Sequence, residues 1–298
     1  MKLFAPRYYT EFECIADKCE HSCCIGWEID IDPRTLKKYK RLKGDYARQI
    51  KRSICKKGTP HFRLCQHDRC PHLNESGLCE IIINYGKDFL CDICTEHPRF
   101  YNDTANGKEV GLGMSCEEAC RIILSADSYA DFVQVDELDF EESELYFNPL
   151  ETRKELFEIL SDKDTPYSKK LDTVYEKYGI SPFLMSNEDY FSCFSELEYL
   201  DKSAKELFLK FKPTREQDPT CEKALERALA YFIFRHLTAA TDENELKRAL
   251  FFALACERLL ASLTLDGSNV LEAARLISQE LEYSQENTEK IKDLISDK

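Results

Sequence analysis

The residues of this sequence best suited to chemistry are its cysteines, and they are concentrated near one end of the chain. Twelve of the fifteen cysteines precede residue 121, and four of them fall within residues 14–24. Thiolates bind zinc and iron–sulfur clusters, usually as sets of four ligands that come from more than one loop. In a reducing compartment such a density favours metal binding over structural disulfides. The sequence therefore predicts a metal-binding module.

The spacing of the thiols constrains the kind of metal site without fixing the metal. Cys23 and Cys24 are adjacent, and neighbouring side chains point in different directions, so two sites or a multi-iron cluster suit the pair better than one small ion. Cys91 and Cys94 form the one Cys-x2-Cys pair, which is too few for a zinc ribbon. The three-cysteine x3-x2 spacing of ordinary radical S-adenosylmethionine loops is also absent. Three late cysteines in apolar surroundings are predicted to be small core residues: Cys193, Cys221 and Cys256.

The segments that must position these thiols have little predicted regular structure. Residues 25–32 alternate apolar and acidic side chains and predict a short strand, and Asp32-Pro33 then opens a helix. Residues 58–100 are interrupted by glycine and proline, and loops of this length need something such as bound metal to order them. Residues 115–130 predict a helix opened by Ser115.

The rest of the chain has a helical apolar period. An acidic connector over residues 131–149 separates it from the cysteine-rich part, and helices are expected at 150–161, 166–179, 187–211, 220–240, 243–264 and 269–296. Helices joined by short connections pack as a bundle. The expected fold is mainly α: a cysteine-rich metal-binding module with little regular structure over residues 1–130, the connector, and an α-helical bundle over residues 150–298.

Composition excludes several functional classes. The 298 residues carry a formal net charge of −14, which disfavours nucleic-acid binding. No apolar run reaches the roughly 18 to 20 residues of a membrane span, and the N-terminus lacks a secretory signal, so we expect a cytoplasmic protein. Residues 34–57 are an exception, with eleven basic residues and one acid. They form either a solvated helix face or a counter-charge for an anionic cluster or an acidic partner.

Several motifs together resemble one family. The opening Pro6-Arg-Tyr-x3-Phe12-x-Cys14-x4-Cys19-Glu-x-Ser-Cys23-Cys24-x-Gly26-Trp27 resembles that of the flagellin lysine-N-methylases, relatives of the Cys-Cys cluster proteins that chelate zinc or iron. The likeness continues at Cys70-Pro-His-Leu, Cys94-x2-His-Pro-Arg99 and Ser115-Cys116-x-Glu-Ala. A Tyr231-x3-Arg235 element in the second half is also similar to that family.

The resemblance implies a bacterial enzyme that methylates lysines of flagellin or a similar surface protein with S-adenosylmethionine and a four-iron cluster. Carried over position by position, it implies eight thiolate ligands: Cys14, Cys19, Cys23, Cys24, Cys70, Cys79, Cys94 and Cys116. Eight ligands would furnish two four-coordinate sites. Four further thiols lie outside the pattern and either complete a third site or are bystanders: Cys55, Cys65, Cys91 and Cys120.

Mechanism and cofactor contacts stay open at this stage. The free lysine amine has a pKa of about 10.4, so polar methyl transfer needs a desolvated pocket and a base, which could be Asp, Glu, Tyr or His; the catalytic residue is unknown. A cluster with three thiolate ligands would instead leave one iron open to S-adenosylmethionine. Arg99 and Arg235 are the candidates for binding the cofactor. The alternative function is a non-catalytic zinc-binding adaptor.

Overall fold

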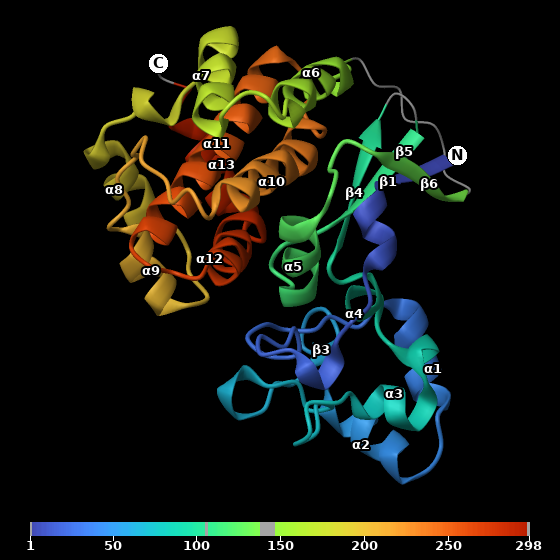
Figure 1. Ribbon diagram of the computed structural model, residues 1–298. Helices are drawn as coiled ribbons and strands as arrows, with labels where there is room; N and C mark the ends of the chain where they lie inside the picture. The colour runs from blue at the N-terminus through green and yellow to red at the C-terminus, as the bar shows by residue number, and fades with distance from the viewer. Residues whose placement is uncertain (1, 105–106, 138–146, 297–298) are drawn as a thin grey trace. The chain divides into compact units, whose positions relative to one another are not determined.

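The computed structural model describes residues 2–104, 107–137 and 147–296 and divides into two compact units (Figure 1). The cysteine-rich unit is Glu13–Arg99, and the helical unit combines Met1–Phe12 with Phe100–Lys298. The expected division was at residues 131–149. The observed one differs because the strands that precede and follow the cysteine-rich unit in sequence belong to a sheet of the helical unit. Residues 138–146 of the expected connector lie outside the described residues.

The cysteine-rich unit contains short elements separated by loops, as its glycine and proline content predicts. They are α1 (Pro33–Arg41), α2 (Asp45–Ser53), α3 (Glu80–Tyr85), α4 (Asp92–Glu96), β2 (Ile54–Cys55) and β3 (His61–Phe62). The side chain of Asp32 accepts a hydrogen bond from the N–H of Thr35, which confirms the predicted start of α1. Gly44, at φ +104°, separates α1 from α2.

The strand predicted at residues 25–32 is present only as isolated pairings. Ile25 bridges Arg69 and Asp30 bridges His61, without a continuous ladder. The alternation itself is confirmed, because Ile29 and Ile31 are buried while Glu28 and Asp30 face solvent. These residues pack into a small core that also includes two thiols: Ile29, Ile31, Tyr39, Ile50, Ile54, Phe62, Cys70, Ile81 and Cys91.

The helical unit begins with a four-stranded sheet that the sequence did not reveal. Its order is β4 (Arg99–Thr104), β5 (Gly107–Leu112), β1 (Lys2–Pro6) and β6 (Phe132–Glu137). β1 runs parallel to β5 and antiparallel to β6, so the central strand pairs with segments more than a hundred residues away in sequence. Glu109 on β5 forms a buried ion pair with Arg153, whose NH2 group lies 2.7 Å from the Glu109 carboxylate.

The helices of this unit follow the predicted periodicity closely. They are α5 (Glu117–Ser125), α6 (Leu150–Ser161), α7 (Tyr167–Tyr178), α8 (Asn187–Ser195), α9 (Lys202–Phe208), α10 (Glu222–Phe232), α11 (Glu243–Leu265), α12 (Val270–Ile277) and α13 (Gln285–Asp293). Two π-helical segments, Ile233–Leu237 and Ser278–Glu282, extend α10 and α12. The residue that caps α5 is Cys116, one position after the predicted Ser115.

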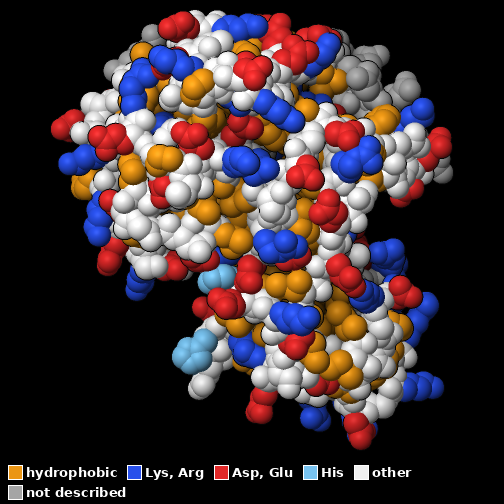
Figure 2. Space-filling model, in the orientation of Figure 1, with side chains coloured by type: hydrophobic (Ala, Val, Ile, Leu, Met, Phe, Trp, Pro, Cys, Tyr) orange, Lys and Arg blue, Asp and Glu red, His pale blue; other side chains and the backbone are white. Residues whose placement is uncertain are grey.

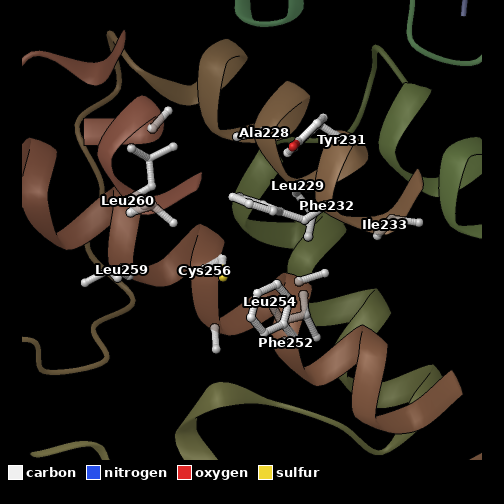
Figure 3. Close-up of a cluster of buried hydrophobic side chains, with 14 of the residues drawn as sticks. Ala228, Leu229, Tyr231, Phe232, Ile233, Phe252, Leu254, Cys256, Leu259 and Leu260 are labelled. Carbon is white, nitrogen blue, oxygen red and sulfur yellow. The ribbon is translucent and has the colours of Figure 1, made fainter. Parts of the chain in front are cut away.

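The core of the helical unit is centred on α10 and α11. Figure 3 shows side chains of both helices meeting there, including Phe232, Phe252, Leu254 and Cys256, all of them buried. Cys193 and Cys256 are buried in this core, and Cys221 packs at its edge. Cys193 and Cys256 are therefore core residues, as predicted, whereas Cys221 is only partly buried.

The surface is charged and mixed in sign. On the face drawn in Figure 2, Lys and Arg side chains are interspersed with Asp and Glu side chains, and hydrophobic atoms show between them. Within the described residues, no helix combines the length and the apolar character that crossing a membrane requires.

Candidate metal centre

Five thiols of the cysteine-rich unit converge on one small core. We call Cys24, Cys70, Cys79, Cys91 and Cys94 the thiol cluster. Cys70 and Cys91 are buried members of the core, and the other three pack against it. All five are free thiols, and electrostatic interactions link them to one another. Four of the five belong to the ligand set that the sequence pattern implied; Cys91 does not.

Backbone hydrogen bonds join the segments of Cys24, Cys70 and Cys79, and a separate bond fixes the turn between Cys91 and Cys94. The N–H of Cys70 donates to the carbonyl of Cys24 at 2.8 Å. Cys79 is joined to the segment of Cys70 through its bridge with Leu73. The N–H of Cys94 donates to the carbonyl of Cys91 at 3.0 Å, which closes the first turn of α4 around the Cys-x2-Cys pair. Cys24, Cys70 and Cys79, which span 55 positions, are thus held by main-chain contacts.

Two of the thiols receive stabilisation suited to a thiolate. A hydrogen bond with the thiol of Cys23 lowers the pKa of Cys24 to about 7, against the effect of burial. Hydrogen bonds with Cys94 and Tyr39 lower the pKa of Cys91, and the contact between the two thiols raises the pKa of Cys94. Cys94 is therefore the donor of this hydrogen bond and Cys91 the acceptor. Since metals bind the thiolate form, this pairing favours a ligand pair.

Cys70 and Cys79 are hydrogen-bonded by main-chain donors. Burial raises the pKa of Cys70 to about 12, and the N–H of His72 opposes that rise. Burial also raises the pKa of Cys79 against N–H donors from Ile82 and Ile81 at the start of α3. Hydrogen bonds to sulfur are a general feature of metal-thiolate sites and stabilise the charged ligand. A bound cation would therefore supply the positive charge that the thiolates of Cys70 and Cys79 need in this buried position.

The spacing of the sulfur atoms bears on the kind of metal. Among residues 2–104, 107–137 and 147–296, ligand atoms of Glu28, Asp30 and His61 lie within 4.8 Å of one another, and those of no three thiols of the cluster do. A tetrahedral zinc ion, with Zn–S of about 2.3 Å, holds its sulfurs about 3.8 Å apart. The sulfur atoms of the cluster would therefore have to move closer together to bind one zinc ion. Sulfur atoms that bind different irons of an iron–sulfur cluster can stay farther apart.

The other implied ligands are distributed differently. Cys14 is exposed, Cys19 is partly exposed and Cys23 is exposed. Cys23 and Cys24 hydrogen-bond to each other through their sulfurs. The two side chains approach each other because the turn at this point departs from both helix and strand, and the expectation of two sites or a multi-iron cluster stays a prediction. Cys116 belongs to the helical unit, where it caps α5.

Cys91 is the cluster member that sequence reasoning left undecided. Its signal was the Cys-x2-Cys spacing with Cys94, which alone cannot show that a thiol faces other ligands. Cys55 lies in β2 and Cys65 is exposed, and neither is a member of the core that holds the cluster. Cys120 is buried in the helical unit, where its thiol donates to the carbonyl of Leu271 at 3.5 Å. It is a packing residue there.

The histidines beside the cluster have other partners. His72 is 1% exposed, and its ring nitrogens lie 2.9 Å from the hydroxyl oxygens of Tyr46 and Ser53. Burial lowers the pKa of His72 to about 4 and that of His97 to about 4. His97 makes an edge contact with Trp27, whose indole N–H donates to the carbonyl of Cys23 at 2.6 Å. These rings support the thiol-bearing loops.

The two candidate cofactor arginines differ in their surroundings. Arg99 donates to the carbonyl of Thr95 at 3.2 Å. Arg235 is held between the rings of Phe100 and Tyr283, donates to Tyr231 at 2.9 Å and lies 3.5 Å from the carboxylate of Glu282. Binding a cofactor carboxylate through Arg235 would compete with Glu282, which is fully buried. This network joins the two π-helical segments, which supply Arg235 and Glu282.

Comparisons with known proteins give three relatives. A lysine-N-methylase of Salmonella typhimurium is 30% identical over 127 residues, which is 40% of this chain and 32% of that protein. A lysine-N-methylase of Salmonella choleraesuis has the same values. The flagellar biosynthetic protein FliU of Salmonella muenchen is 30% identical over 127 residues, 40% of this chain and 75% of FliU. The match thus spans about a third of the two lysine-N-methylases. No protein-family model and no solved structure matches the chain.

Proposed function

This chain belongs to the flagellin lysine-N-methylase family, and we propose from that membership that it is an S-adenosylmethionine-dependent protein-lysine N-methyltransferase. Its proposed substrate is flagellin or a similar surface protein. The observation that carries the proposal is the likeness to relatives named lysine-N-methylase and FliU. The match covers 40% of the chain and a third of the lysine-N-methylases, so the activity requires a direct test.

The thiols fit the proposed iron–sulfur cluster by their chemistry. Cys24, Cys70, Cys79 and Cys94 come from three loops and meet in one core, as the ligands of a cluster do. A bound cluster would supply redox chemistry or would order the loops around it. Cys14, Cys19, Cys23 and Cys116 stay proposed metal ligands, the first three in the cysteine-rich unit and Cys116 in the helical unit. Zinc is the alternative metal.

The chain must also bind S-adenosylmethionine and the target lysine. Arg99 is the proposed partner of the cofactor carboxylate, since a guanidinium can bind a carboxylate through two parallel hydrogen bonds. Arg235 is the weaker candidate, because Glu282 and Tyr231 already hold its guanidinium. A buried base would be needed to remove the proton of the lysine ammonium before polar transfer.

The decisive experiment measures methyl transfer. Protein purified without oxygen, with its metal content determined, is incubated with flagellin, S-adenosylmethionine and reductant, and the flagellin is analysed by peptide mass spectrometry. We expect lysine-containing peptides to gain about 14 Da per methyl group. Cys24→Ser should abolish the gain, while Cys65→Ser, at an exposed thiol outside the cluster, should preserve it. Unmodified lysines with metal-loaded protein would refute the proposed activity.

A second candidate function is a zinc-binding adaptor without catalytic activity. It is favoured by the loop-rich architecture of the cysteine-rich unit, in which bound metal could serve only to order the chain. Colour separates the two, because zinc is transparent and iron–sulfur clusters absorb visible light. Colourless, zinc-loaded protein from an oxygen-free preparation, without methyl transfer, would support the adaptor.

A further inference from the structure

Cys91 is the thiol for which sequence pattern and structure differ most. The pattern shared with the family passes over position 91, and the structure places the side chain inside the thiol cluster, 1% exposed. Cys91 and Cys94 hydrogen-bond through their sulfurs, and Cys91 also interacts with Cys70 and Cys79. We propose that Cys91 is a metal ligand of the cysteine-rich unit, acting with Cys94 as a two-thiol hook. This inference deepens the proposed function and rests on it for the presence of a metal.

The local structure around Cys91 resembles that of a ligand rather than of a packing thiol. Its carbonyl accepts from the N–H groups of Cys94 and Thr95, both at 3.0 Å, and from the hydroxyl of Thr95 at 3.1 Å. These bonds fix a tight turn in which two thiols three positions apart face the same side. Cys-x2-Cys turns present paired thiolates to zinc and to iron in many small metal sites.

The hydroxyl group of Tyr39 contacts the sulfur of Cys91. The Tyr39 hydroxyl oxygen lies 3.7 Å from that sulfur and 2.7 Å from the carbonyl of Phe89. The hydroxyl donates its one hydrogen to Phe89, so its oxygen orients the sulfur of Cys91 by contact. The packing cysteines of the helical unit differ, because Cys120 and Cys193 donate their thiol hydrogens to main-chain carbonyls and are thereby satisfied without a metal.

Ligation by Cys91 would give this centre five candidate thiols, one more than a four-coordinate site needs. All five lie in the cysteine-rich unit, so that unit could complete a four-coordinate centre from its own residues even if one of the five is not a ligand. The exposed thiols Cys14 and Cys23 would be available for another site.

The test measures metal in the full chain, purified without oxygen and reconstituted with iron and sulfide. We compare Cys91→Ala with Cys94→Ala and with the control Cys65→Ala, by iron per chain and by visible absorption. Alanine suits a buried apolar position, so a purely packing role predicts unchanged iron for Cys91→Ala. Ligation predicts a loss of iron for Cys91→Ala as large as that for Cys94→Ala, with Cys65→Ala unchanged. Full iron and an unaltered spectrum in Cys91→Ala would overturn the proposal.

Alkylation of the unaltered protein keeps the proposal testable if Cys91→Ala fails to fold. Metal-loaded and chelator-treated protein are alkylated in the same moderate urea concentration and mapped by mass spectrometry. Cys256 is the matched control, because it is also 1% exposed but lies in the helical core. Ligation predicts that chelation accelerates labelling of Cys91 and Cys94 together and leaves Cys256 unchanged. Equal labelling of Cys91 before and after chelation would overturn it. Neither readout depends on methyl transfer, so the proposed activity can fail independently.

Discussion

Tyr39 and Cys91 are 52 positions apart in sequence, and the Tyr39 hydroxyl lies 3.7 Å from the Cys91 sulfur. Tyr39 is fully buried on α1, between the basic outer face of that helix and the core of the cysteine-rich unit. The contact joins the first regular helix of the unit to the Cys-x2-Cys turn at its end. The thiol cluster is thus supported by a helix that contributes no ligand.

Replacing Tyr39 by phenylalanine tests this support. Tyr39→Phe keeps the ring and removes the hydroxyl, which leaves the carbonyl of Phe89 without its 2.7 Å donor. We expect the free energy of unfolding of the cysteine-rich unit to fall by about 1 to 3 kcal/mol. Urea denaturation followed by fluorescence measures it, because Trp27 is the single tryptophan and lies in this unit.

The matched control is Tyr85→Phe. Tyr85 contributes its ring to contacts with Tyr46 and Phe89. We expect Tyr85→Phe to change the free energy of unfolding of the cysteine-rich unit by less than about 0.5 kcal/mol. Equal effects of the two substitutions would show that the Tyr39 hydroxyl has no special role.

The buried carboxylate of Glu282 is predicted to be a major stabilising group of the helical unit. It accepts from Tyr231 at 2.8 Å and lies 2.7 Å from the Nε2 atom of His236. Glu282→Ala leaves Arg235 as a buried charge without its partner, so we expect a loss of about 3 to 5 kcal/mol in unfolding free energy. Urea denaturation followed by circular dichroism measures the loss.

A surface ion pair provides the comparison for Glu282. Glu155 lies 2.8 Å from Lys177, and these side chains are 49% and 44% exposed. Glu155→Ala should cost less than about 1 kcal/mol, because water screens exposed charges. A Glu282→Ala loss as small as this would mean that the buried network contributes little.

The same network predicts that acid destabilises the helical unit. Burial lowers the pKa of His236, although Glu282 opposes this effect. Burial would raise the pKa of Glu282, but Arg235 and His236 outweigh it and the pKa is lowered. Both groups bind protons more weakly in the folded state, so their contribution is present above the unfolded pKa values, about 6.5 for His and 4.3 for Glu, and is lost below them.

Circular dichroism during urea unfolding at several pH values measures this dependence. Stability should fall first below about pH 6.5, through His236, and further below about pH 4.3, through Glu282. His236→Gln should lose the first part of the slope and keep the second. Arg235 and Lys292 also face His236, and Arg235 lies 3.5 Å from the carboxylate of Glu282. An unchanged slope in His236→Gln would contradict this assignment.

Sequence periodicity predicted the helices well because their contacts are local. The helix expected at 150–161 is Leu150–Ser161, and the one expected at 243–264 is Glu243–Leu265. The long helix expected at 187–211 is divided, since Asp201 caps a new helix by accepting from the N–H of Ser203. The sheet escaped prediction because its strands are short and β1 pairs with residues near 108 and 133, a distance that no local pattern encodes.

The thiol cluster could be predicted only in part from the sequence. Cysteine density predicted a metal site, and the implied residues Cys24, Cys70, Cys79 and Cys94 do lie together. Cys91 could not be assigned, because whether its side chain faces ligands or aliphatic neighbours depends on the turn that α4 makes. The contact between the sulfurs of Cys23 and Cys24 likewise depends on a backbone turn that the sequence did not reveal.

Removal of bound metal should unfold one unit and spare the other. The core of the cysteine-rich unit is small and includes two thiols, so it depends on whatever binds them. The helical unit has a large aliphatic and aromatic core built on α10 and α11. Chelation should therefore shift Trp27 fluorescence towards that of the unfolded chain and leave most helical circular dichroism intact, since the long helices belong to the other unit. Restoring metal should reverse the fluorescence change. If both signals collapse together the two units unfold cooperatively, and if neither moves the thiols do not need a metal to hold their loops.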